Sequence, residues 1–253
     1  MRILVAGKGG TGKTIVAGLI VRSLIEEGAE APILAVDADP DSNLGETLGV
    51  SVGSTLGDIR EELSREQRRM GPEVDKRIWL ESRIFEILVE GDKFDLLAMG
   101  RPEGPGCYCA VNNILRNLLD SLANSYRYVV IDAEAGLEHI SRRTAGSVDE
   151  AIIVTDFSLK GFRTAKRMMK LAESLGSRFG RFHLIANRVN DGREDLARMA
   201  SQVGLSIDAI IPEDSEVSTA DREGRSVFTL DPASKALSAV KGFVVGKILE
   251  GRK

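Results

Sequence analysis

Short apolar runs alternate with longer amphipathic stretches along most of the chain. The runs are rich in β-branched residues, which is typical of strands buried on both faces of a sheet. The expected strands cover residues 3–6, 33–36, 94–98, 128–131, 151–155, 182–186 and 207–211. Helical periodicity between them is clearest over residues 14–27, 114–122 and 160–175.

This order of elements predicts an α/β fold, with a mostly parallel central sheet that helices flank on both faces. In such folds, ligands bind at the carboxyl ends of the strands. Residues 54–93 interrupt the alternation with charged, helical sequence, so we expect a helical insertion at one edge of the sheet. The chain of 253 residues is long enough for one large core, and we expect residues 1–253 to form a single domain.

The composition of the chain limits the kinds of partner and the cellular compartment that we expect. The chain has 34 Lys and Arg against 38 Asp and Glu, a formal net charge of -4. A mildly acidic chain is a poor candidate for general binding to nucleic acid or to an anionic membrane. The first residues do not resemble a signal peptide, and no apolar stretch reaches the ~20 residues that span a bilayer. We therefore expect a cytoplasmic protein.

A phosphate-binding motif follows the first expected strand and opens the first expected helix. It fits the pattern G-x-x-x-x-G-K-[ST], in which glycines let successive backbone N–H groups point at one anion. Lys13 is expected to contact the β- and γ-phosphates, and Thr14 to bind Mg²⁺. The fold is therefore expected to be that of a P-loop NTPase. The motif consists of Gly7, Lys8, Gly9, Gly10, Thr11, Gly12, Lys13 and Thr14.

Carboxylates follow two of the expected strands. Asp39 comes after the second strand and Asp132 ends the fourth, with Gly136 four residues later. At the carboxyl edge of a parallel sheet, such carboxylates position an attacking water or hold the water shell of the metal. The Gly136 N–H would lie where it can sense the γ-phosphate. The alternative is that these residues only cap the helices that follow them.

Lys8 is more specific than the rest of the motif, because an ordinary P-loop does not require a lysine there. The sequence Gly-Lys-Gly-Gly-Thr-Gly-Lys-Thr resembles the deviant Walker A signature of the MinD, ParA and nitrogenase iron protein class of ATPases. The resemblance implies a homodimeric ATP hydrolase in which Lys8 reaches the phosphates of the partner subunit. It also implies that Asp39 orients the hydrolytic water, that Asp132 lies near magnesium, and that Asn187 and Pro212 lie at the adenine.

The only two cysteines, Cys107 and Cys109, share one Gly- and Pro-rich loop before a helix. A helix N-terminus lowers the pKa of a thiol, and thiolates are soft ligands for Zn²⁺ or Ni²⁺. Two thiolates do not complete a four-coordinate site, but the same loop of a second copy would supply the other two. The alternative is a pair of unrelated cysteines that serve as small buried residues.

The Cys-Tyr-Cys sequence, together with the segment around Asp132, resembles the CooC family of ATPases, which mature carbon monoxide dehydrogenase by delivering nickel. The sequence departs from that family at Glu134, where glycine is expected. The resemblance implies that Cys107 and Cys109 bind Ni²⁺ (or Zn²⁺) across a dimer that depends on ATP and metal. The implied client is apo carbon monoxide dehydrogenase or the related acetyl-CoA synthase complex.

Two other hypotheses stay open. A spatial regulator of the MinD or ParA kind predicts a basic surface or a membrane-binding helix, and residues 236–253 have one apolar face despite Gly242 and Gly246. An electron-transfer ATPase like the nitrogenase iron protein predicts a cysteine near Asp132, and none is present there.

Overall fold

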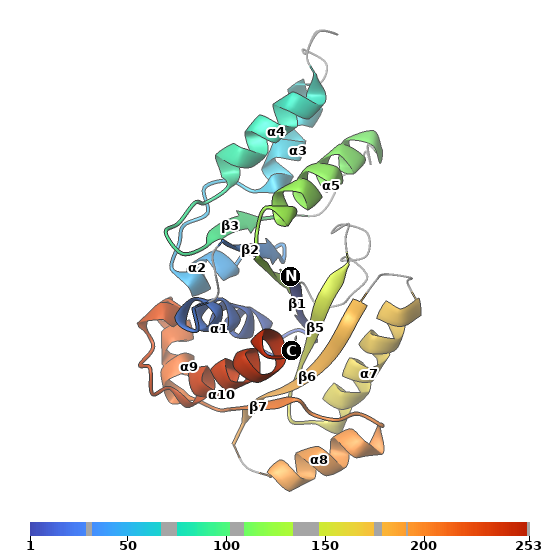
Figure 1. The fold of residues 1–253 in the computed structure, drawn as a ribbon, viewed down its shortest axis with the longest axis vertical. Helices are drawn as coiled ribbons and strands as arrows, with labels where there is room; N and C mark the ends of the chain where they lie inside the picture. The colour runs from blue at the N-terminus through green and yellow to red at the C-terminus, as the bar shows by residue number, and fades with distance from the viewer. Residues whose placement is uncertain are drawn as a thin grey trace.

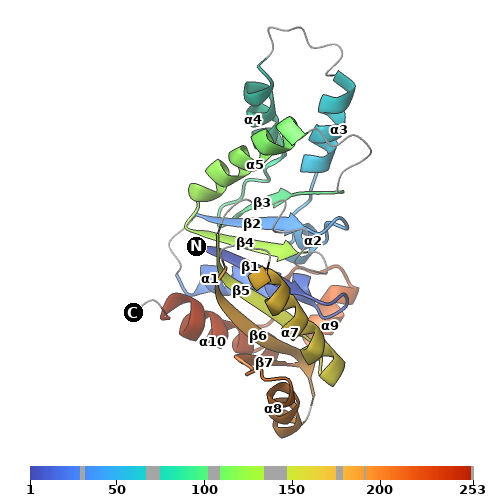
Figure 2. The ribbon, with the colours of Figure 1, turned by 90° about the vertical axis from the view of Figure 1, so that its right-hand side faces the viewer.

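The computed structural model describes residues 1–28, 32–66, 75–101, 109–133, 147–174, 179–190 and 192–251. Seven strands form one sheet in the order β3-β2-β4-β1-β5-β6-β7 (Figures 1 and 2). Every pairing between neighbouring strands in this sheet is parallel. The strands are β1 (Arg2–Gly7), β2 (Ile33–Ala38), β3 (Asp95–Ala98), β4 (Tyr128–Ala133), β5 (Val148–Thr155), β6 (Phe179–Val189) and β7 (Ala209–Pro212).

Helices cover both faces of the sheet, and Figure 2 shows α7 in front of the strands and α5 beside the β3 edge. The helices are α1 (Lys13–Glu26), α2 (Leu44–Leu48), α3 (Leu56–Glu66), α4 (Lys76–Ile87), α5 (Cys109–Asn124), α7 (Leu159–Ser174), α8 (Arg193–Gln202), α9 (Ser215–Arg222) and α10 (Lys235–Phe243). Two short segments join them: η1 (Val227–Thr229) is a 3₁₀-helix, and η2 (Val244–Leu249) is a π-helix. The expected α/β fold is confirmed.

The two faces of the sheet bury two separate apolar cores, as the alternation of side chains along a strand requires. On β1, Leu4 and Ala6 pack with α3, α4, α5, α7 and α8. Ile3 and Val5 point to the opposite face, where they pack with α1, α2, α9, α10 and η2. Because β1 is central and buried on both faces, its sequence is apolar throughout, which is why the run was recognisable.

The segment expected to interrupt the alternation contains α3 and α4, which lie beside the edge strand β3 (Figure 1). Near the other terminus, α10 and η2 run through Gly242 and Gly246 as one helical stretch. Their apolar side chains, including Leu237, Val240 and Ile248, are buried against α1 and the sheet. Among the described residues, no helix is both long and apolar enough to cross a membrane.

Candidate nucleotide site

The phosphate-binding motif forms the turn between β1 and α1. Gly10 and Gly12 have φ angles of 79° and 83°, in the left-handed region that glycine adopts without strain. The Thr11 hydroxyl and backbone N–H both donate to the carbonyl oxygen of Lys8, at 2.8 and 3.4 Å. The loop is thus closed on itself, with the N-terminus of α1 directed at its centre.

Two of the motif's glycines lie against other strands of the sheet. A Cβ atom on Gly7 would come within 2.3 Å of the carbonyl oxygen of Val154 on β5. A Cβ atom on Gly12 would come within 2.6 Å of the side-chain nitrogen of Asn187. That nitrogen donates to the carbonyl oxygen of Thr11 at 2.8 Å. These contacts place the loop at the carboxyl ends of β5 and β6.

A cavity of about 660 Å³ opens in front of this loop, a volume in the range of small-molecule sites. Six of the residues expected from sequence line it: Gly9, Gly10, Gly12, Lys13, Thr14 and Asp39. The other residues that line it are Ile15, Asp41, Asn43, Glu46, Thr47, Arg188, Asp221, Gly224 and Arg225.

Asp132 is a deeply buried carboxylate of the site, with 1% of its surface exposed. Neither of its carboxylate oxygens has a hydrogen-bond partner among the described residues. Burial raises its pKa to about 7, and the negative charges of Asp37 and Asp39 act in the same direction. Thr14 and Lys13 lower this pKa. A buried carboxylate without a partner, beside the hydroxyl of Thr14, fits the position of a hydrated magnesium ion.

Asp37 lies next to Asp132 in the register of β2 and β4. Its two oxygens accept from the backbone N–H of Leu44 at 2.8 Å and of Asp39 at 3.2 Å. Burial raises its pKa to about 6. Asp37 therefore shapes the turn that carries Asp39 into the cavity, a role that the sequence alone did not assign.

Asp39 is half-buried, and its carboxylate accepts from the backbone N–H of Asp41 at 3.1 Å. The turn is closed by a hydrogen bond from the backbone N–H of Ser42 to the carbonyl oxygen of Asp39. Ser42 has a φ of 51°, in the left-handed region. The carboxylate of Asp39 thus faces the same cavity as Lys13, which is the arrangement expected of a residue that orients water.

Lys8 does not line the cavity of its own chain. Its ammonium nitrogen lies 3.8 Å from a carboxylate oxygen of Asp156, just beyond the end of β5, and both side chains are exposed. Exposed pairs of this kind contribute little to stability, so Lys8 is available to other anions.

The two residues expected at the adenine, Asn187 and Pro212, are not among those that line the cavity. Asn187 is buried and holds the P-loop through Thr11, and the cavity is lined by its neighbour Arg188. Arg188 has a φ of 57°, a strained value for a residue with a side chain. Pro212 ends β7 and is not among the residues that line the cavity.

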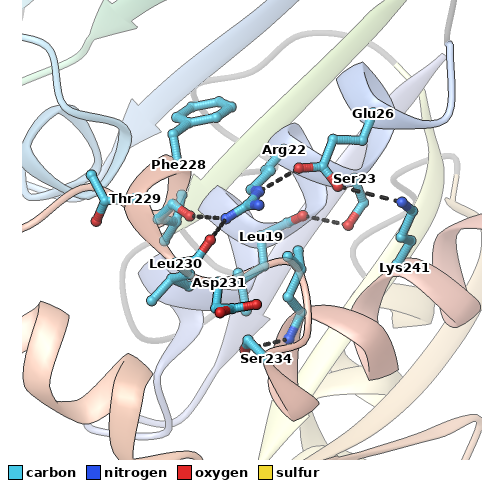
Figure 3. Close-up of polar contacts among 12 residues, drawn as sticks. Leu19, Arg22, Ser23, Glu26, Phe228, Thr229, Leu230, Asp231, Ser234 and Lys241 are labelled. Carbon is cyan, nitrogen blue, oxygen red and sulfur yellow. Dashed lines mark hydrogen bonds and ion pairs between the residues drawn. The ribbon is translucent and has the colours of Figure 1, made fainter.

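Arg225, Asp221 and Gly224, on the far wall of the cavity, were missed by sequence reasoning. The segment that follows them is anchored by Arg22 of α1, which is buried (Figure 3). One guanidinium nitrogen donates to the carbonyl oxygens of Val227 at 2.6 Å and Leu230 at 2.9 Å. The Nε of the same guanidinium donates to Glu26 at 2.6 Å. An arginine within the apolar sequence of α1 was the only sign of this contact in the sequence. It did not indicate the partners, which lie about two hundred residues away in the chain.

The cysteine loop is described only at its end. Cys109 is the first residue of α5, although its side chain lies outside the described part, and Cys107 and Gly136 lie outside it altogether. Helix α5 follows β3, so it starts from the same edge of the sheet as the P-loop. Within the described ranges, no group of three or more His, Cys, Asp or Glu residues is arranged to hold a metal ion.

A parallel sheet, a glycine loop closed at a helix N-terminus and buried carboxylates beside its Lys and Thr define a P-loop ATPase. Residues 3–227 match the model of the CobQ/CobB/MinD/ParA nucleotide binding domain. The chain belongs to this family and is an ATP hydrolase of the P-loop class.

Two relatives align over nearly the whole chain. An uncharacterized ATP-binding protein of Methanocaldococcus jannaschii is 47% identical over 244 residues, which cover 95% of this chain and 96% of that protein. The carbon monoxide dehydrogenase accessory protein CooC of Rhodospirillum rubrum is 33% identical over 248 residues, which cover 93% and 92%.

Solved structures show the same fold. A ParA family ATPase from Chlorobium tepidum superposes with a TM-score of 0.72 at 23% identity, covering 97% of this chain and 98% of that one. The septum site-determining protein MinD of Pyrococcus horikoshii, complexed with Mg-ADP, gives a TM-score of 0.70 at 23% identity, covering 100% and 98%.

Proposed function

We propose that this ATPase is a metallochaperone that works as a homodimer in the cytoplasm. It binds Ni²⁺ (or Zn²⁺) as cargo on Cys107 and Cys109 of both subunits, and delivers the metal to carbon monoxide dehydrogenase or the related acetyl-CoA synthase complex. The observation that carries this proposal is the Cys-Tyr-Cys loop in an ATPase that is 33% identical to CooC. Nucleic acid and membranes are not partners in this proposal.

The nucleotide would be held by residues that already face the cavity. The P-loop N–H groups and Lys13 would bind the phosphates, and Thr14 with Asp132 would hold magnesium and its water shell. Bound magnesium supplies charge neutralisation on the phosphate oxygens. Asp39 would orient the attacking water, and Lys8 would leave Asp156 and reach the phosphates of the other subunit. The backbone N–H of Gly136, which comes after β4 in the chain, would sense the γ-phosphate.

A direct backbone contact joins the nucleotide side to the segment that leads into the cysteine loop. The Met99 N–H donates to the carbonyl oxygen of Asp37 at 2.8 Å, and the Met99 carbonyl accepts from Gly57 at 3.0 Å. Asp37 also shapes the turn that carries Asp39. A change at Asp39 on hydrolysis would therefore reach the chain just before Cys107. We propose that residues 1–253 act as one ATPase domain in this cycle, with the insertion at residues 54–93.

The alternative is a regulatory switch of the MinD or ParA kind without a metal. A septum site-determining protein MinD of Bacillus subtilis is 24% identical over 248 residues of alignment. This alternative loses support from the C-terminal stretch, whose apolar face packs on α1 and the sheet and is not free for a membrane.

Size-exclusion chromatography with elemental analysis tests the proposal. Wild type and Cys107→Ser/Cys109→Ser would each be loaded with nickel, with and without ATP. The expected result is one metal per two chains in wild type, bound by a dimer, and none in the double variant. If the double variant dimerises with ATP and retains nickel as wild type does, the metallochaperone proposal is wrong and the regulatory switch is favoured.

A further inference from the structure

A second cavity, of about 380 Å³, lies between helices α4 and α5, which run side by side next to the β3 edge of the sheet (Figures 1 and 2). None of the residues that line the nucleotide cavity lines this one. Its floor is apolar and contains Ile84, Leu88, Leu118 and Leu122. We call this cavity the α4–α5 groove.

Apolar side chains continue from the groove onto the open surface of α4. Phe85 lines the groove with 57% of its surface exposed, and Ile78 is 66% exposed. These are two of the three large hydrophobic residues that are exposed in the described part of the chain. They are seven residues apart on one helix, so both lie on the same face, about 10 Å apart along its axis. Exposed apolar side chains that adjoin a groove mark a binding surface.

The rim of the groove is acidic. Glu81, Glu90 and Asp95 line it, and no Lys or Arg is among the described residues that do. Tyr126 donates its hydroxyl to Asp95 at 2.5 Å. The pKa of Tyr126 is raised by burial and by the negative charges of Asp95 and Glu90. The groove therefore presents an apolar floor between carboxylates.

We propose that the α4–α5 groove docks an amphipathic helix of a partner protein, with apolar side chains along one face and Lys or Arg beside them. The spacing of Ile78 and Phe85 matches apolar residues that recur every two turns of such a helix, and the carboxylates match its cations. A symmetric contact between two copies would set the acidic rim of one groove against the acidic rim of the other, so charge repulsion disfavours self-association through this groove. This inference does not depend on the metal or on its client.

A fluorescein-labelled amphipathic peptide of about 18 residues, with leucines on one face and lysines beside them, is the probe. A second peptide carries glutamates in place of the lysines. Fluorescence anisotropy with the full chain is expected to show at least about tenfold tighter binding of the lysine peptide. Phe85→Ser is expected to weaken that binding about tenfold, as removal of a central anchor does, whereas Phe157→Ser, at another exposed phenylalanine, changes it less than about twofold.

Charge reversal separates this site from non-specific adhesion. Glu81→Lys/Glu90→Lys is expected to prefer the glutamate peptide, and the ATPase rate of each variant reports that it is folded. Ile78→Ser replaces Phe85→Ser if the latter does not fold. Equal binding by wild type and both apolar variants, or an unchanged peptide preference after charge reversal, overturns the proposal. So does sedimentation that shows wild type dimerising through Phe85 while it binds neither peptide.

Discussion

Asp37 and Asp132 are register partners on β2 and β4, so two buried carboxylates stand side by side at the edge of the sheet that faces the P-loop. Asp37 is satisfied by two backbone N–H groups, whereas Asp132 has no hydrogen-bond partner among the described residues. The negative charge of Asp37 disfavours ionisation of Asp132, and the positive charge of Lys13 only partly offsets this effect and the effect of burial. We therefore expect Asp132 to be protonated more often in the metal-free protein, and to lose its proton when magnesium binds.

This pair predicts how stability depends on pH. The pKa values, about 6 for Asp37 and about 7 for Asp132, lie above those of unfolded carboxyl groups, so the native protein binds more protons than the unfolded chain. This stabilisation is fully present below about pH 4 and is lost as the pH rises through about 7. Asp132→Asn removes the buried charge and should raise the free energy of unfolding at pH 8 by about 2–4 kcal/mol, without magnesium or nucleotide.

Urea unfolding of wild type and Asp132→Asn at pH 5 and pH 8, in EDTA, measures the effect. Asp92→Asn, at an exposed position, is the matched control and should behave as wild type does. If wild type and Asp132→Asn lose the same stability between the two pH values, Asp132 is ionised in the empty site and the prediction is wrong.

Lys8 should act on the nucleotide of the other subunit. Lys8→Ala should lower the rate of ATP hydrolysis about 100-fold or more, as loss of a group that stabilises transition-state charge does, and leave stability almost unchanged because its pair with Asp156 is exposed. Asp39→Ala should also be inactive. A mixture of the two variants should regain activity, since a mixed dimer has one site with Asp39 in place and Lys8 supplied from across the interface.

Steady-state hydrolysis by the mixture, titrated over the ratio of the two variants, gives the answer. Activity is expected to peak near an equal ratio. A mixture as inactive as its components, in which mixed dimers are shown to form, would mean that Lys8 serves its own subunit.

Because parts of the P-loop are closely packed, its glycines should differ in how well they tolerate substitution by alanine. Gly7→Ala should lower the free energy of unfolding by about 3 kcal/mol and abolish ATP binding, because its Cβ would lie 2.3 Å from the Val154 carbonyl oxygen, and backbone cannot move aside cheaply. Gly9→Ala is the control for stability, since nothing lies within 4 Å of its added Cβ and its φ is not positive. Urea unfolding of both variants checks the packing, and equal losses of stability in the two would contradict the packing argument. ATP titration of Gly7→Ala checks the loss of binding.

Arg22 should matter for both stability and nucleotide affinity. Arg22→Met leaves the carbonyl oxygens of Val227 and Leu230 without their buried donor, and should cost about 2–4 kcal/mol of unfolding free energy. The KM for ATP should rise, because Arg225 and Gly224 precede the anchored segment. Arg65→Ala removes an exposed ion pair to Glu61 and should stay within about 0.5 kcal/mol of wild type. If the KM for ATP is unchanged in Arg22→Met, the hydrogen bonds of Arg22 do not affect nucleotide binding, and this part of the prediction is wrong.

The sheet was predictable because its strands are buried on both faces and read as continuous apolar runs, as in Ile3, Leu4 and Val5. The Gly-rich motif was predictable because it is local. The pairing of Asp37 with Asp132 was not, since it depends on β2 lying beside β4 in a strand order that the chain does not follow. The far wall of the cavity at Arg225 was missed for the same reason: its segment is held by residues distant in the chain, among them Arg22.

Strand and helix ends differed from expectation where side chains made a contact that the pattern did not show. The last strand begins at Ala209 and excludes Ile207, and the Leu184 N–H of β6 there donates to the carboxylate of Asp208 at 3.0 Å. The C-terminal helix passes two glycines because its apolar face is buried, and burial outweighs their low helix propensity.

The most direct test of the central claim is the affinity for nickel in two nucleotide states. Equilibrium titration of wild type would be made with a non-hydrolysable ATP analogue and with ADP, and repeated with Lys8→Ala. Coupling between the nucleotide and the cysteines predicts at least about tenfold tighter nickel binding in the ATP state of wild type, and no such difference in Lys8→Ala. Equal affinities in both nucleotide states of wild type would contradict a nucleotide-driven metallochaperone.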